Sequence, residues 1–257
     1  MRRGVLAVAT ILLAAFPALG QAGTTGDRLI NLPTHLTLGP ATFQVTFTHR
    51  FSQTVDDGGG RELFGFDSAA DIGIGVAMGF GRDWQVDLVR SSFLKEWEAA
   101  CKWTLARQGD GMPVGVGVRG GADYRGASGL TERWSGFLQL IATRRFAEEL
   151  DVFVVPMYAS DTPTLRNAAN VAVGAAWHLP KGWDVEAEVV PDNGDARGGT
   201  TAWAVAINKR LEGHAFLIYL GNSRATMTDM MVGSDFPGGF RAGDVRVGFN
   251  ILRRFPE

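Results

Sequence analysis

Residues 41–51 read ATFQVTFTHRF, and this stretch decides the fold. Apolar and polar side chains alternate along it, as in the run Phe43-Gln44-Val45-Thr46-Phe47. A repeat of two residues predicts a β-strand, because successive side chains point to opposite faces of a sheet. This strand therefore has one apolar face and one polar face.

The same alternation recurs along the rest of the chain. It is clear in Trp183-Asp184-Val185-Glu186-Ala187-Glu188, whereas 133–146 and 151–159 are less regular and their register stays open. Twelve strands are predicted, at residues 41–51, 71–80, 84–90, 95–106, 113–124, 133–146, 151–159, 168–178, 183–190, 200–210, 214–221 and 243–255. The count is even, as single-chain bacterial membrane barrels require.

The connections between the strands give a second signal. Those after even-numbered strands are short, as at Gly81-Arg82-Asp83, and five of the six after odd-numbered strands are longer. Membrane barrels have tight turns at one rim and longer loops at the other. Aromatic residues such as Trp177 and Trp183 stand beside the short turns, as expected at a membrane interface. The sequence therefore predicts an all-β fold, a transmembrane antiparallel up-and-down β-barrel of twelve strands.

The start of the chain resembles an export signal. Arg2 and Arg3 precede an uncharged apolar run from Gly4 to Phe16, and small residues follow. We therefore expect a cleaved signal peptide at 1–22 and an outer-membrane β-barrel at 23–257. No later apolar run approaches the ~18 residues of a transmembrane helix. The net charge of −2 gives no electrostatic argument for binding nucleic acid.

Several motifs within residues 29–108 resemble a known family. They are Leu29-Ile30-Asn31-Leu32-Pro33-Thr34, Phe47-Thr48-His49-Arg50-Phe51, Phe64-Gly65-Phe66-Asp67, Arg90-Ser91-Ser92 and the stretch from Lys102 to Gln108. This family is an uncharacterised group of bacterial outer-membrane β-barrels, catalogued as a domain of unknown function. The resemblance implies a barrel in the outer membrane of a Gram-negative bacterium. It implies no activity, substrate or catalytic residue.

The chain shows no arrangement typical of catalysis. A lipase built on a barrel needs a serine and a histidine on the same face of a strand. His49 lies nearest the outer rim, but Ser52 is three residues further on and points the other way. The histidines and carboxylates lack metal-ligand spacing, and the glycines near 73–75 and 115–117 adjoin no helix that could bind a nucleotide. We therefore expect no enzyme activity, no cofactor and no metal.

The candidate functional residues are charged side chains on the polar faces of the strands. They are Arg50, Asp87, Glu96, Glu98, Lys102, Arg119, Asp184, Glu186, Glu188, Arg210 and Arg246. In one interpretation they line a narrow passive channel or transporter for small solutes, with a mild preference for cations. In the other they close the lumen with salt bridges, in a structural or adhesion-type protein that acts through its outer loops.

The size of the barrel allows both interpretations. Twelve strands enclose a lumen between that of filled eight-stranded barrels and that of open porins. Many inward-facing positions are Gly or Ala, which leaves space free and favours the channel. The expected partners are outer-membrane lipid, the barrel-assembly machinery through the C-terminal strand at 243–255, and small solutes.

Overall fold

The computed structural model describes residues 26–131, 133–163, 167–192, 200–233 and 244–255. The predicted signal peptide at 1–22 lies outside these residues. Within them, no helix combines the length and apolar character needed to cross a membrane.

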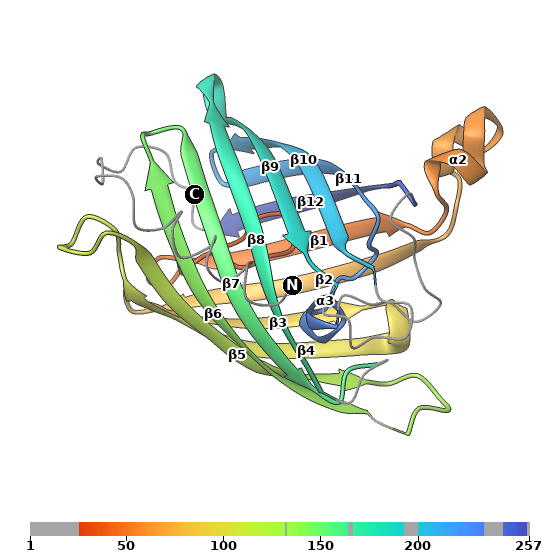
Figure 1. Ribbon diagram of the computed structural model, residues 1–257, viewed down its shortest axis with the longest axis horizontal. Coiled ribbons are helices and arrows are strands. Elements are labelled where there is room, and N and C mark those ends of the chain that lie inside the picture. The colour runs from red at the N-terminus through yellow and green to blue at the C-terminus, as the bar shows by residue number, and fades with distance from the viewer. Residues whose placement is uncertain (1–25, 132, 164–166, 193–199, 234–243, 256–257) are drawn as a thin grey trace.

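Twelve antiparallel strands close into a barrel in which each strand pairs with its neighbours in sequence and β1 pairs with β12 (Figure 1). The strands are β1 (Phe43–Phe51), β2 (Ala70–Phe80), β3 (Trp84–Ser91), β4 (Glu96–Ala106), β5 (Gly115–Arg125), β6 (Trp134–Phe146), β7 (Leu150–Ser160), β8 (Asn167–Leu179), β9 (Trp183–Val190), β10 (Ala202–Leu211), β11 (His214–Gly221) and β12 (Arg246–Phe255). The predicted up-and-down barrel of twelve strands is confirmed. Closure leaves no strand edge unpaired, which a lipid environment demands.

The two rims of the barrel differ in their connections. At one rim, here called the short-turn end, the strands are joined by 81–83, 107–114, 147–149, 180–182 and 212–213. The opposite rim, the long-loop end, carries 52–69 and 222–245 among its connections. The sorting by length is as predicted except at 107–114, which is as long as 126–133 at the other rim.

Short helices lie only in the connections of the described chain. They are α2 (Val55–Gly58), η1 (Gly59–Gly65), η2 (Phe93–Lys95), η3 (Pro180–Gly182) and α3 (Thr228–Val232). Figure 1 shows α2 projecting beyond the rim, whereas α3 lies within the outline of the barrel.

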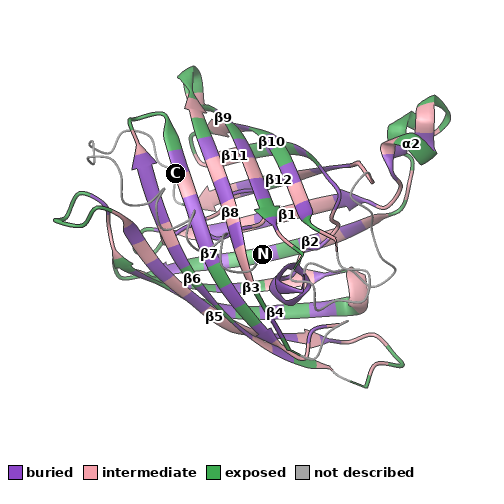
Figure 2. Cartoon of the chain, viewed as in Figure 1, coloured by how far each residue is buried: buried purple, intermediate pink, exposed green. Residues whose placement is uncertain are grey.

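The strands alternate between buried and exposed residues, visible as purple and green bands in Figure 2. In β2, Ile74, Val76 and Met78 are exposed, while Gly75 and Ala77 between them are buried. An apolar outer surface of this kind suits a hydrocarbon environment. Aromatic side chains mark both rims: Trp84 stacks on Trp103 at the short-turn end, and Tyr124 contacts Trp134 at the long-loop end.

Alternation is interrupted in β6 and β7, the stretches whose register the sequence left open, and also in other strands such as β12. The inner faces of β6 and β7 carry apolar side chains, including Ile141, Phe153 and Val155, which are at most 1% exposed. The outer face of this wall is apolar, and its inner face mixes these apolar side chains with polar ones such as Gln139 and Asp151. The reason lies in what fills the lumen.

Candidate functional site

Residues 26–38 lie inside the barrel and are here called the plug. Leu29 donates its backbone N–H to the Leu32 carbonyl at 2.9 Å, and Thr34 donates to the Asp27 carbonyl at 3.1 Å, so the segment folds back on itself. Leu29, Ile30 and Leu32 are at most 2% exposed. The plug thus has a tight turn at its tip, enclosed by the strands.

Asp27 anchors the plug near the short-turn end. Its carboxylate accepts hydrogen bonds from Gln44 Nε2 at 3.1 Å and Gln85 Nε2 at 3.2 Å, and its carbonyl accepts one from Lys102 Nζ at 2.8 Å. Burial works against the charged carboxylate, but the cations Lys102, Arg28 and Arg254 hold the pKa of Asp27 below its ordinary range. Asp27 therefore ties the plug to β1 and β3 through its charged side chain and to β4 through its backbone carbonyl.

The tip of the plug contacts β1, β9 and β12. Glu188 Oε1 on β9 accepts hydrogen bonds from the backbone N–H groups of Asn31 and Leu32, each at 2.8 Å. Arg50 donates to Asn31 Oδ1 at 2.9 Å, and Asn250 donates to the Ile30 carbonyl at 2.8 Å. The turn's backbone is thereby satisfied by the barrel wall, as buried polar groups require.

His35 fills the space that two inward-facing glycines leave. A Cβ on Gly115 would lie 2.3 Å from His35 Nε2, and one on Gly117 would lie 3.0 Å from the His35 Cα. Burial, assisted by Lys102, lowers the pKa of His35 to about 4, so the ring is neutral at pH 7. Likewise, a Cβ on Gly174 would meet Leu29 at 2.6 Å. The interpretation of inward glycines as free space was wrong at these positions: the plug occupies it.

The second insertion is α3, which enters from the long-loop end (Figure 1). Thr228 donates its N–H to Glu98 Oε2 at 2.8 Å and accepts a hydrogen bond from Arg119 at 3.0 Å. Asp229 forms an ion pair with Arg125. Burial raises the pKa of Asp229 to about 6, although Arg125 opposes the shift. The helix is thus held to β4 and β5 by charge-assisted contacts.

The plug and α3 share an apolar cluster with β6 and β7. Its members include Leu29, Leu32, Phe137, Ile141, Phe153, Val155, Met157, Met227, Met230 and Val232. A polar cavity of about 40 Å³ remains between the two insertions, bordered by Asp27, Lys102 and Arg119. This volume holds only a few water molecules. A larger cavity of about 280 Å³ opens beside the plug between β10, β11 and β12.

The predicted lumen residues lie on the inner face and contact partners there. Buried members are Arg50, Asp87, Glu96, Glu98, Lys102, Arg119, Asp184, Glu186, Glu188 and Arg246, while the Arg210 side chain is 25% exposed. Arg119 pairs with both Asp87 and Glu98, and Arg210 pairs with Asp184. Asn208 donates to Glu186 at 2.8 Å. The structure thus pairs most of the acids that the sequence set side by side.

Other inner residues were missed. Asp123 and Arg125 share the inward parity of Arg119 on β5, so the alternation itself could have identified them. Asp151 and His178 belong to a second cluster at the short-turn end, where the His178 ring contacts Asp151 at 3.0 Å and Asp184 at 2.6 Å. The plug gave no periodic signal.

The family comparison covers both the barrel and the plug. A family model described as a membrane bound beta barrel domain (DUF5777) matches residues 25–255. The chain belongs to this family. The predicted resemblance is confirmed, and the DUF5777 match includes the Leu29-to-Thr34 motif, which forms the tip of the plug. A comparison with curated proteins finds no match.

Solved structures that resemble this DUF5777 barrel are outer-membrane proteins. The NanC porin is 9% identical, with 82% of this chain and 97% of that one covered and a TM-score of 0.51. The COG4313 outer membrane channel from Pseudomonas putida F1 is 13% identical, with coverages of 91% and 100% and a TM-score of 0.51. A mutant of outer membrane phospholipase A from Escherichia coli is 12% identical, with coverages of 84% and 91% and a TM-score of 0.50. At these identities the likeness shows the fold alone.

Proposed function

We propose that this barrel is a small-solute channel of the Gram-negative outer membrane that is closed at rest and opens when the plug is displaced. The observation that carries the proposal is the occupation of the lumen from both ends, by the plug and by α3. A wide porin would leave its lumen hydrated. Here passage requires a segment to move.

The contacts on one side of the plug are of a kind that water can replace. Asp27 and Asn31 are held by hydrogen bonds to polar side chains of the wall. Hydrogen bonds between neutral groups contribute about 0.5–1.5 kcal/mol each, and those to a charged group such as the Asp27 carboxylate or the Arg50 guanidinium about 1.5–3 kcal/mol, because water takes over both partners when they separate. The 280 Å³ cavity beside the plug gives solutes and water a place to enter. These features support a displaceable plug.

The second candidate is a structural or adhesion-type protein whose lumen stays closed. The apolar cluster shared by Leu29, Leu32 and the α3 methionines favours it, because burying such side chains stabilises the closed arrangement. In that case the protein acts through the connections of the long-loop end.

The proposal includes no enzymatic activity. His49, the histidine nearest the outer rim, stacks on Phe249 with ring centres 4.9 Å apart and also contacts Phe51 at 4.4 Å. This aromatic setting supports a packing role for His49. The proposed partners remain outer-membrane lipid, small solutes, and the barrel-assembly machinery through β12.

A disulfide that fixes the plug to the wall separates the two candidates. A Cβ on Gly117 would lie 3.3 Å from the His35 Cβ, close to the ~3.5–4.5 Å of a disulfide. The variant carries His35→Cys, Gly117→Cys and Cys101→Ser. Its uptake of a small sugar into proteoliposomes is compared, oxidised and reduced, with that of the wild type. In the matched control, the second cysteine replaces Gly120, on the outer face of β5, and Gly117 is unchanged.

If the protein is a channel, we expect slow sugar uptake by the wild type, loss of uptake in the oxidised His35/Gly117 variant, and recovery of uptake on reduction. The Gly120 control should conduct in both states. Wild-type uptake equal to that of protein-free liposomes removes the channel and leaves the structural candidate. Equal uptake by the oxidised and reduced variant removes the plug as the gate.

A further inference from the structure

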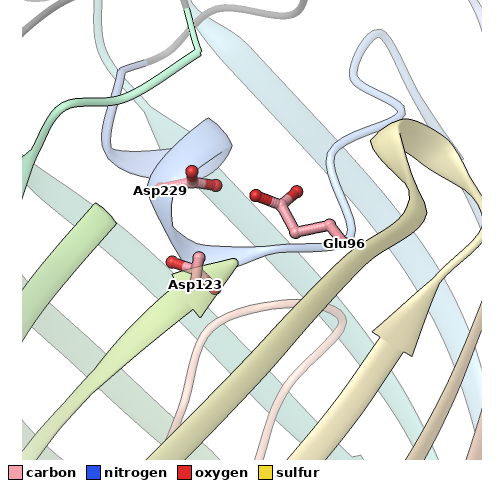
Figure 3. Close-up of side chains that lie close together, drawn as sticks. All are labelled: Glu96, Asp123 and Asp229. Carbon is pink, nitrogen blue, oxygen red and sulfur yellow. The ribbon is translucent and has the colours of Figure 1, made fainter. Parts of the chain in front are cut away.

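Three carboxylates from distant parts of the chain meet inside the barrel near the long-loop end. Glu96 begins β4, Asp123 lies on β5, and Asp229 lies on α3. Figure 3 shows the three side chains pointing toward one another. One oxygen of each lies within 4.8 Å of the others, and all three residues are 0% exposed.

Most of the oxygens in this cluster lack a hydrogen-bond donor among the described residues. Both oxygens of Glu96, both of Asp123 and Oδ1 of Asp229 are buried without one. A buried carboxylate oxygen without a partner is strongly unfavourable. This arrangement calls for a positive ligand at the point where the oxygens converge.

The nearby cations do not balance the cluster. Arg125 pairs with Asp229 and lies 3.8 Å from Glu96 Oε1. Arg119 is engaged by Glu98 and Asp87. Three carboxylates and one guanidinium leave a charge of −2, which a divalent cation would neutralise.

The donor set and its burial indicate the kind of cation. Carboxylate oxygens suit hard cations, and thiolate or imidazole ligands are lacking in the cluster. Ca²⁺ binds oxygens at about 2.3–2.6 Å, so ligands on opposite sides of it are about 4.6–5.2 Å apart. Mg²⁺ binds at about 2.0–2.1 Å and demands a tighter octahedron. Oxygens within 4.8 Å of one another can share a Ca²⁺ ion, and their full burial disfavours Mg²⁺, which usually keeps several of its waters.

We propose that Glu96, Asp123 and Asp229 form a Ca²⁺ site that fastens α3 to the barrel wall. Two ligands belong to the wall and the third to the insertion, so the ion joins parts of the chain that are separate in sequence. The site stands on its own geometry, whether or not the barrel conducts solutes.

The test is thermal unfolding of the mature chain in detergent, with EDTA and with excess Ca²⁺. Ca²⁺ should raise the unfolding temperature of the wild type by several degrees, because a ligand of the folded state stabilises it by mass action. Asp123→Asn should abolish this rise. In EDTA the same variant should unfold at or above the wild-type temperature, since it removes an unpaired buried charge. The order of the two unfolding temperatures, variant and wild type, thus reverses between EDTA and excess Ca²⁺.

Glu186→Gln is the matched control, because Glu186 is also a buried lumen acid but binds Asn208 on another wall. It should keep the full response to Ca²⁺. Equilibrium dialysis should find one Ca²⁺ per wild-type chain and none in Asp123→Asn. Absence of a Ca²⁺ effect on the wild type, or an unchanged effect in Asp123→Asn, overturns the site. An equal response to Mg²⁺ overturns the selectivity for Ca²⁺.

Discussion

At the scale of single residues, the inner wall is organised around arginines that each satisfy several acceptors. Arg119 is the clearest case: it donates to Asp87, Glu98, Gln139 and Thr228. It thereby joins β3, β4, β5 and β6 to α3. Its guanidinium cannot lose its proton in a protein, so the two carboxylates stay paired at every pH at which they are charged.

Arg119→Met should strongly destabilise the barrel, by about 3–5 kcal/mol, because it leaves two buried carboxylates without their partner. Arg107→Met is the matched control. Arg107 forms a 2.5 Å ion pair with Asp83, but both side chains are partly exposed and the effect should be at most about 1 kcal/mol. Urea-induced unfolding in lipid vesicles measures both. Similar losses of stability in the two variants would contradict the role of Arg119 in joining these strands to α3.

At the scale of elements, each strand separates a lipid-facing row from a lumen-facing row. On β4, Cys101 is exposed between Ala99 and Trp103, while the adjacent Lys102 is 1% exposed and reaches the plug. The alternation in the sequence predicts this arrangement, and the structure agrees with it.

Cys101 should therefore be shielded by lipid. A water-soluble maleimide should leave it unlabelled in intact membranes and label it after denaturation. Asp110→Cys combined with Cys101→Ser supplies the control, because Asp110 is exposed in the connection between β4 and β5 and its replacement should react at once. Rapid labelling of Cys101 in intact membranes would mean that β4 faces the other way or is not embedded.

The elements also show how far the sequence could lead. Period two predicted twelve strands within three residues of their bounds, because a strand between lipid and a polar lumen must alternate. It weakened in β6 and β7, whose inner faces pack against the plug and α3. The plug itself is a turn held by Glu188 and Arg50, side chains more than a dozen residues away, so no local pattern encodes it.

The ion pairs could not be predicted from the sequence, for a related reason. Parity places Glu98 and Arg119 on the inner face, but only the register between β4 and β5 decides that they meet. The Asp229 carboxylate comes from a long connection whose path inward depends on the apolar surface of β6 to β8. The sequence shows on which face of a strand a side chain lies, whereas its contacts depend on how the strands pair in the closed barrel.

At the scale of the whole molecule, the structure is a closed cylinder with an apolar outside and an interior filled from both ends. The plug reaches in from the short-turn end and α3 from the long-loop end, and they meet across the apolar cluster and the 40 Å³ polar cavity. A barrel that is closed at rest requires the plug to lie against β5 in the membrane-embedded protein.

Disulfide formation between introduced cysteines tests that position most directly. With Cys101→Ser as background, His35→Cys plus Gly117→Cys should form a disulfide spontaneously in isolated membranes, detected as a mobility shift that reductant removes. His35→Cys plus Gly120→Cys, on the opposite face of β5, should form none. We expect near-complete crosslinking of the first pair alone. Failure of that pair to crosslink, or equal crosslinking of both, would contradict a plug seated in the lumen.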